Sequence, residues 1–123
     1  MTHANLLFPI CGQTTRLPEH LAQDALRLAG PYGAPDELDV ERHLQCHLQV
    51  HETAHHFALV LDLAGTATGA IWTRWADDAS PAALDTLPDC SHIDPESHEP
   101  CGEFAGHPGA HTYQLTTPPV VNP

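Results

Sequence analysis

One arrangement of cysteine and histidine occurs twice in this chain of 123 residues. The letters CHLQVHETAH occupy positions 46–55, and CGEFAGHPGAH occupies positions 101–111. Each copy gives a cysteine, four or five further residues, a histidine, three residues and a second histidine. Thiolate and imidazole bind zinc in structural sites, and the H-x3-H spacing falls within the range seen there. A chain that must close both segments around an ion has few ways to fold.

Each copy supplies three ligands, whereas a closed zinc site needs four. The two remaining cysteines, Cys11 and Cys90, each lie upstream of one copy. In the second copy Gly106, Pro108 and Gly109 are incompatible with a regular helix, so its two histidines must lie on a turn. The sequence therefore predicts two Cys2His2 sites. Their ligands are Cys11, Cys46, His51 and His55 in the first site, and Cys90, Cys101, His107 and His111 in the second.

The fourth ligand is the least constrained part of this prediction, because other histidines lie nearby. These alternatives are His47, His56, His92 and His98. A plainer hypothesis treats the cysteines as small buried apolar residues and the histidines as surface residues. Leu, Ile, Val and Phe together make up only 26 of the 123 residues, near the level at which chains stop folding unaided. An ion that binds only the folded state would supply the missing stability, and we expect two Zn2+ ions per chain.

The first copy is followed by a strand-like stretch, a turn and the letters WTRW at 72–75. This order resembles small uncharacterised bacterial Cys/His proteins, in which a C-(few)-H-x-G-x-H turn precedes a hairpin that ends in paired tryptophans. The resemblance covers roughly residues 46–75. The second copy matches the glycine of that turn with Gly109, whereas the first copy has Thr53 there. The resemblance implies metal binding and no assigned activity.

The remaining patterns predict a small α+β fold. Residues 18–30 combine a proline suited to a first helical turn, an apolar stripe and a terminal glycine, which together predict a helix. Alternating apolar and polar residues over 44–50 predict a half-buried strand, and residues 57–75 predict a β-hairpin. The apolar run 6–11 contains a proline and predicts an edge strand. We expect a small antiparallel sheet with one N-terminal helix and loops stapled by zinc.

We expect a single domain over residues 1–115. Within it, residues 76–100 hold seven acids, no basic residue and several prolines, a composition typical of an irregular segment. A short turn around 82–87 is all the structure expected there. Residues 116–123 are expected to form a frayed tail.

HETAH at 51–55 also matches H-E-x-x-H, which zinc proteases carry on a helix with the glutamate activating a metal-bound water. Glu52 would then be catalytic, but the second copy has Pro108 at that place, which favours a structural ion. A helix over the same region would instead stack four histidines at every fourth position, as a metal-buffering protein could use. They are His43, His47, His51 and His55. The alternation over 44–50 favours a strand over this ladder.

Sixteen acidic residues, four arginines and no lysine give a formal net charge of −12. Nucleic acid and anionic membranes are not expected as partners, because both require a basic surface on the protein. A basic protein surface is the partner that the charge favours. No targeting or membrane-spanning segment is recognised, so a cytoplasmic location is expected. A homodimer that shares a site between two chains is compatible with the sequence.

We therefore expect a zinc-binding interaction or regulatory module rather than an enzyme. A minimal zinc hydrolase that uses Glu52 and a histidine-rich metal buffer are the alternatives.

Overall fold

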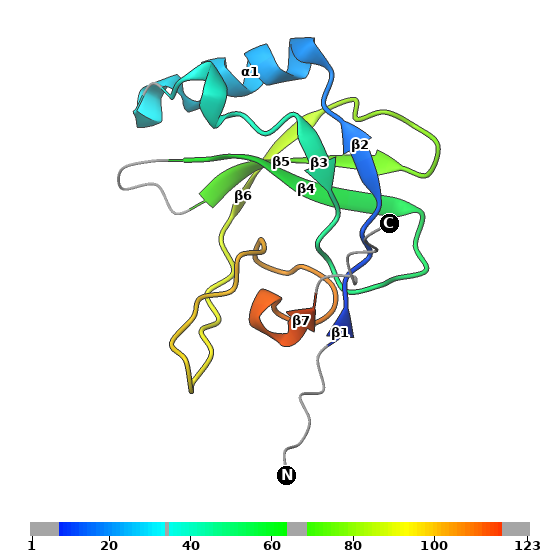
Figure 1. The fold of residues 1–123 in the computed structure, drawn as a ribbon. Coiled ribbons are helices and arrows are strands. Elements are labelled where there is room, and N and C mark those ends of the chain that lie inside the picture. The colour runs from blue at the N-terminus through cyan, green and yellow to red at the C-terminus, as the bar shows by residue number, and fades with distance from the viewer. Residues whose placement is uncertain (1–7, 34, 64–68, 117–123) are drawn as a thin grey trace, which may run out of the picture.

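The computed structural model describes residues 8–33, 35–63 and 69–116. Within these ranges the chain forms one α-helix, three short 3-10 helices and seven strands in three small sheets, which confirms the predicted α+β class. Figure 1 shows helix α1 (Glu19–Ala29) over one face of the central sheet, while the chain after strand β6 (Leu84–Pro88) lies toward the opposite side. No helix in these ranges is long and apolar enough to span a membrane.

The central sheet has the order β4 (His55–Asp62), β5 (Gly69–Ala76) and β6, and both pairings are antiparallel. β4 and β5 form the hairpin predicted over 57–75, as expected of segments rich in β-branched and aromatic residues. A register shift between Leu59 and Leu61 interrupts their pairing. Residues 64–68, where we expected the turn of this hairpin, lie outside the described ranges.

β6 lies inside the acidic segment 76–100, where we expected no more than a short turn. Its backbone pairs with β5 along the edge of the sheet, so its acids can remain in solvent. Leu84 and Leu87 are half-buried and pack against the apolar clusters on opposite faces of the sheet. Pairing with β5 and the contacts of these two leucines therefore hold an otherwise polar strand, and overall composition does not reveal them.

Helix α1 matches the prediction over 18–30 to within about one residue. Its buried residues are Leu21, Ala22, Ala25 and Ala29, and the small alanines let it lie close to the sheet. This face joins residues of β4 and β5, including Ile71 and Trp75, in the main apolar cluster. Arg42 donates hydrogen bonds to Glu19 at 3.1 Å and lowers the pKa of this exposed carboxyl to about 2.

The N-terminal residues form two further pairings. β2 (Thr14–Arg16) pairs antiparallel with β3 (His43–Gln45), and β1 (Phe8–Pro9) pairs parallel with β7 (Leu115–Thr116). β1 falls within the predicted edge strand 6–11, of which residues 6 and 7 lie outside the described ranges. Of the predicted tail 116–123, Thr116 ends β7 and the rest is not described. The 3-10 helices are η1 (Gly30–Tyr32), η2 (Glu37–Asp39) and η3 (Thr112–Gln114).

The strand predicted over 44–50 is short in the structure, because β3 ends at Gln45. After it the chain folds around Cys46, whose sulfur accepts a hydrogen bond from the backbone N–H of Leu48. Gln49 returns to strand-like pairing in an isolated bridge with Ile10. Leu44, Cys46 and Leu48 are thus buried as the alternation predicts, but the last two lie in a loop around the Cys46 thiol and not in a strand.

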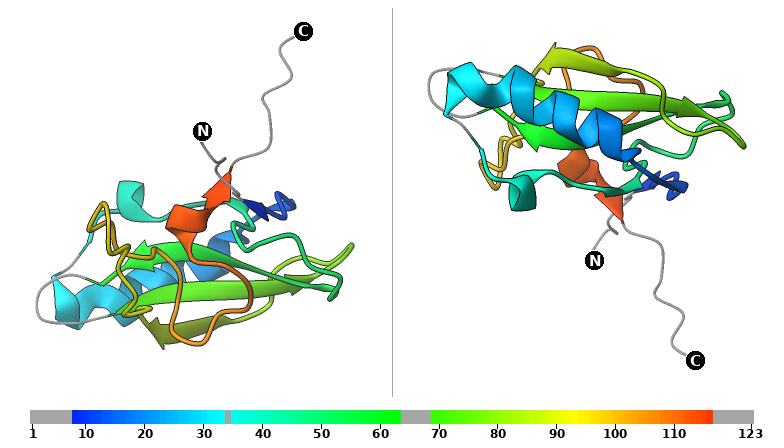
Figure 2. Two further views of the ribbon diagram at one scale, coloured as in Figure 1. Left: turned by 90° about the horizontal axis from the view of Figure 1, so that it is seen from below. Right: turned by 90° about the horizontal axis from the view of Figure 1, so that it is seen from above.

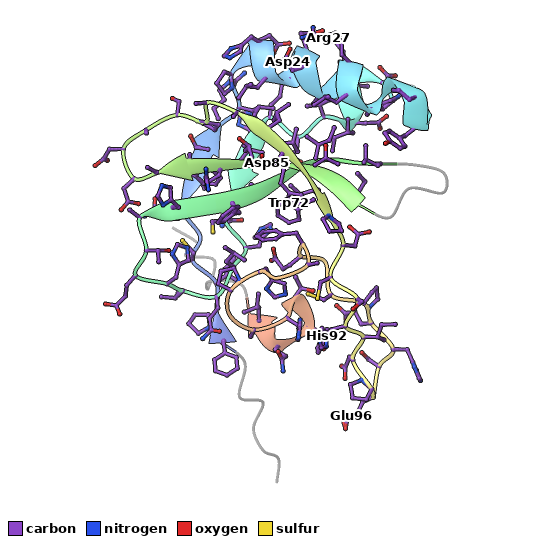
Figure 3. All side chains as sticks on the ribbon, turned by 180° about the vertical axis from the view of Figure 1, so that it is seen from behind. Asp24, Arg27, Trp72, Asp85, His92 and Glu96 are labelled. Carbon is purple, nitrogen blue, oxygen red and sulfur yellow. The ribbon has the colours of Figure 1, made fainter. Side chains whose placement is uncertain are left out.

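The second face of the sheet is covered by the chain after β6, as the two views in Figure 2 show. Phe104 lies with its ring centroid 5.0 Å from those of both Trp72 and Phe57. Trp72 and Trp75 are each 5 % exposed, one on each face, so the sheet is buried on both sides. Figure 3 shows Trp72 on the side of the sheet nearest the C-terminal segment. These aromatic contacts hold in place the segment that carries the second Cys/His copy.

Candidate metal centres

The first group of candidate ligands draws on residues far apart in the sequence. Cys11 follows β1, Cys46 follows β3, His51 lies in the loop after it, and His56 lies near the start of β4. Their ligand atoms all lie within 4.8 Å of one another. Cys11 Sγ is 3.4 Å from His56 Nδ1, and Cys46 Sγ is 3.6 Å from His51 Nε2. Two sulfurs and two ring nitrogens therefore converge on one point.

His56 takes the place in this group that the sequence prediction gave to His55. β4 begins at His55, and successive side chains of a strand point to opposite faces. His55 is exposed, whereas His56 is 4 % exposed and lies 5.4 Å from Trp75 between ring centroids. The sequence shows the H-x3-H spacing in both copies, but the first group in the structure uses His51 and His56, which are spaced H-x4-H. His56 is one of the alternative ligands named from the sequence, and the burial of its side chain against Trp75 is what selects it.

The second group contains all four residues predicted for it. Cys90 follows β6, Cys101 lies in the next loop, and His107 and His111 lie on the expected turn. Cys101 Sγ is 3.5 Å from His107 Nε2, Cys90 Sγ is 3.6 Å from His111 Nδ1, and these two nitrogens are 3.3 Å apart.

The turn that carries this pair of histidines depends on glycine. Gly106 has φ +83° and Gly109 has φ +77°, in the left-handed region that glycine adopts without strain. The two glycines that predict this turn from the sequence are therefore the residues that form it, because both adopt the left-handed conformation.

Backbone N–H groups point at the sulfurs of both groups. Cys46 accepts from Leu48 and Phe57, Cys90 accepts from His92, and the Thr112 nitrogen lies 3.5 Å from Cys101 Sγ. Burial raises the pKa of Cys46 to about 11 and raises that of Cys90, while these N–H groups lower both. Donors aimed at a buried sulfur favour its thiolate form, and a bound cation would balance the resulting charge.

Neighbouring groups also orient three of these histidines, through the ring nitrogen that does not face the sulfurs. His56 Nδ1 faces Cys11, and its Nε2 lies 2.5 Å from Asp77 Oδ1. His51 Nδ1 lies 2.9 Å from Thr53 Oγ1, and His107 Nδ1 lies 3.1 Å from the Pro108 carbonyl. One ring nitrogen thus faces the sulfurs while the other is held by a neighbour, as in histidines that bind metals. From the sequence alone, Asp77 is expected to be a solvated acid at the end of the hairpin.

His92 lies beside the second group. Its ring stacks on that of His111 with 4.3 Å between centroids, and Tyr113 stacks on His111 at 5.5 Å. Figure 3 shows His92 beside the 3-10 helix η3, which follows His111. Burial and the neighbouring His92 and His107 lower the pKa of His111, which favours the neutral imidazole that can bind a metal. The other alternative ligands, His47 and His98, also lie outside both groups.

The helix required by the two alternative functions is not formed. Residues 52–54 form a bend and His55 begins a strand, so His51 and His55 do not share a helical face. Glu52 is exposed at this bend. The histidine ladder lacks its helix for the same reason, since His43 lies in β3.

No protein-family model matches the sequence, and comparisons with curated proteins and with solved structures also gave no match. The resemblance to small bacterial Cys/His proteins therefore stays a prediction from the motif. The geometry of this chain establishes two Cys2His2-like groups, each of which could hold a metal ion.

Proposed function

We propose that this protein binds two structural zinc ions and presents the fold that they stabilise to a basic protein partner. The observation that carries the proposal is the convergence of four donor atoms within 4.8 Å at each of two places. Two sulfurs and two nitrogens around one point are the donor set of structural zinc sites, and tetrahedral S2N2 geometry favours zinc over calcium or magnesium.

Several features support a structural rather than a catalytic ion. Each group supplies four protein donors, whereas catalytic zinc keeps a position open for water or substrate. In the first group Cys46 is fully buried and His56 is 4 % exposed, so access to the ion would be limited. Glu52, the candidate base, is exposed on a bend. Residues 51–55 therefore do not form the helix on which the H-E-x-x-H interpretation depends, which supports a structural ion.

The two sites would compensate for the small apolar core. The first would join the N-terminal segment, the loop after β3 and strand β4, and the second would close the long segment after β6. Structural zinc contributes on the order of 10 kcal/mol in small domains, comparable with the whole stability of a typical domain. Metal binding and folding would then be one equilibrium.

The proposed partner follows from charge. The net charge of −12 and the absence of lysine favour association with a basic protein surface and oppose nucleic acid. Complementary charge of this kind would mainly accelerate association, and the rate should fall steeply with salt.

Metal content of three proteins tests the zinc proposal. The wild type should carry two zinc ions per chain by inductively coupled plasma mass spectrometry. Cys46→Ser and Cys101→Ser should each lose one ion, because each removes a donor from a different group. His20→Ala removes a histidine of the exposed helix face and serves as the control, which should keep both ions. A metal-free wild type, or cysteine variants that keep both ions, would contradict the proposal.

A further inference from the structure

The loops that carry the two groups touch through one side chain. Gln49 lies between Cys46 and His51, in the loop of the first group. Its Oε1 accepts a hydrogen bond of 2.9 Å from the backbone N–H of Ala110, which is 61 residues further along and lies between His107 and His111. The first loop thus supplies an acceptor to the turn of the second group.

The packing at this contact is close. A Cβ atom on Gly109 would lie 2.8 Å from the Cβ of Gln49, so glycine allows the turn to approach this side chain directly. The turn contains two residues with positive φ, Gly106 and Gly109, and glycine loses much conformational freedom when it is fixed. An external hydrogen bond that fixes the turn would lower the cost of bringing its histidines together.

The N-terminal segment provides a second connection between the loops. Cys11, a candidate ligand of the first group, donates its N–H to Leu48 O at 2.7 Å, and Val50 donates to Pro9 O at 2.9 Å. β1, just before Cys11, pairs with β7, with Phe8 opposite Leu115. An ion that fixes Cys11 therefore also fixes the strand against which the residues after His111 pair.

From these contacts we infer that Gln49 is a positioning residue for the second metal site and that the two ions bind cooperatively. This inference rests on the proposed function, because it requires metal at both groups. When the first ion fixes the loop from Cys46 to His51, Gln49 is held where Ala110 can bond to it. The second ion then meets a turn that is already ordered. Thermodynamic reciprocity requires the second ion to strengthen the first site by the same factor.

A zinc titration followed site by site by NMR tests this inference. The amide signals of Gly106 and Gly109 report the second group, and that of Gly12, next to Cys11, reports the first. With free Zn2+ set by a competing chelator, Gln49→Met should lower zinc affinity at the second group roughly 3- to 10-fold, the range for one lost hydrogen bond. Gln49→Glu keeps an acceptor oxygen and should restore most of that affinity.

If Gln49 positions the second site through the first ion, the effect of Gln49→Met should depend on that ion. If Gln49 only contributes to packing, the effect should be the same without the ion. In a Cys46→Ser background the second group should already be weakened, and Gln49→Met should weaken it no further. An unchanged affinity in Gln49→Met, or an equal loss with and without the first site, would overturn the inference.

His51→Ala takes the place of Cys46→Ser if the cysteine variant does not fold, because it removes a different donor from the first group. Zinc affinity at the second group should again be lowered in His51→Ala, and Gln49→Met should lower it no further. An unchanged affinity at the second group in His51→Ala would count against coupling. Failure of zinc to bind at either group would instead refute the proposed function.

Discussion

At the level of single residues, the first group depends on which way a histidine faces at the start of β4. His55 and His56 are adjacent, yet one is exposed and the other is buried against Trp75. The buried ring also has both nitrogens engaged, one toward Cys11 and one toward Asp77. Both positions hold a histidine, so only the direction of the side chain makes His56 a candidate ligand and His55 a surface residue.

A pair of alanine variants tests this assignment. His56→Ala should reduce the bound zinc from two ions to about one, because the first group would keep three donors. His55→Ala should retain both ions, because its side chain points into solvent. Cobalt(II) substitution, with its thiolate charge-transfer band, would measure occupancy in both proteins. The reverse pattern would restore the H-x3-H assignment.

Asp77 offers a second test at this scale. Asp77→Asn keeps the size of the side chain but removes the charge that holds His56, so zinc affinity at the first group should fall roughly 10-fold. Chelator competition monitored through the Gly12 amide would measure it. The matched control is Asp78→Asn, where φ of +60° is one that asparagine also accepts. Equal losses in both variants would indicate a general effect of charge rather than orientation of His56.

At the level of elements, the regular segments were readable from the sequence and the loops were less so. The helix over 18–30 and the hairpin over 57–75 have local periodicity, and the structure forms both. β6 was not predicted from the sequence, because its stability depends on pairing with β5. That pairing is a property of the sheet and does not show in the acidic sequence of β6 itself. The loop after β3 has the alternating sequence of a strand, but its backbone folds around Cys46, so the predicted strand is shorter in the structure.

A glycine pair tests the packing of the central sheet. In Gly69→Ala the new Cβ would lie 2.7 Å from the Leu87 carbonyl oxygen, so the variant should lose about 1–3 kcal/mol of unfolding free energy. Gly102→Ala would place its Cβ 3.7 Å from the Thr112 side chain, which is an ordinary contact, and should change the unfolding free energy by less than about 0.5 kcal/mol. Urea unfolding of the zinc-loaded proteins would give both values. A neutral Gly69→Ala would show that β5 and β6 are less closely paired than described.

At the level of the whole molecule, the sequence predicted seven of the eight residues that the structure gathers into two groups. The repeated spacing of cysteine and histidine, the position of the two remaining cysteines upstream of the copies, and the glycines of the second turn led to this prediction. The position of His56 and the hydrogen bond from Ala110 to Gln49 were not accessible, since each requires the relative placement of distant segments. That placement is what the proposed ions would fix.

The central claim is that zinc holds this fold together, and complete metal removal tests it most directly. The protein should be treated with a strong chelator under reducing conditions, and its amide NMR spectrum recorded before treatment, after it, and after Zn2+ is returned. The account predicts a dispersed spectrum that collapses to that of an unfolded chain and recovers when two equivalents of Zn2+ are added. A spectrum that stays dispersed after all metal is gone would contradict a structural role, and would favour a buffering protein.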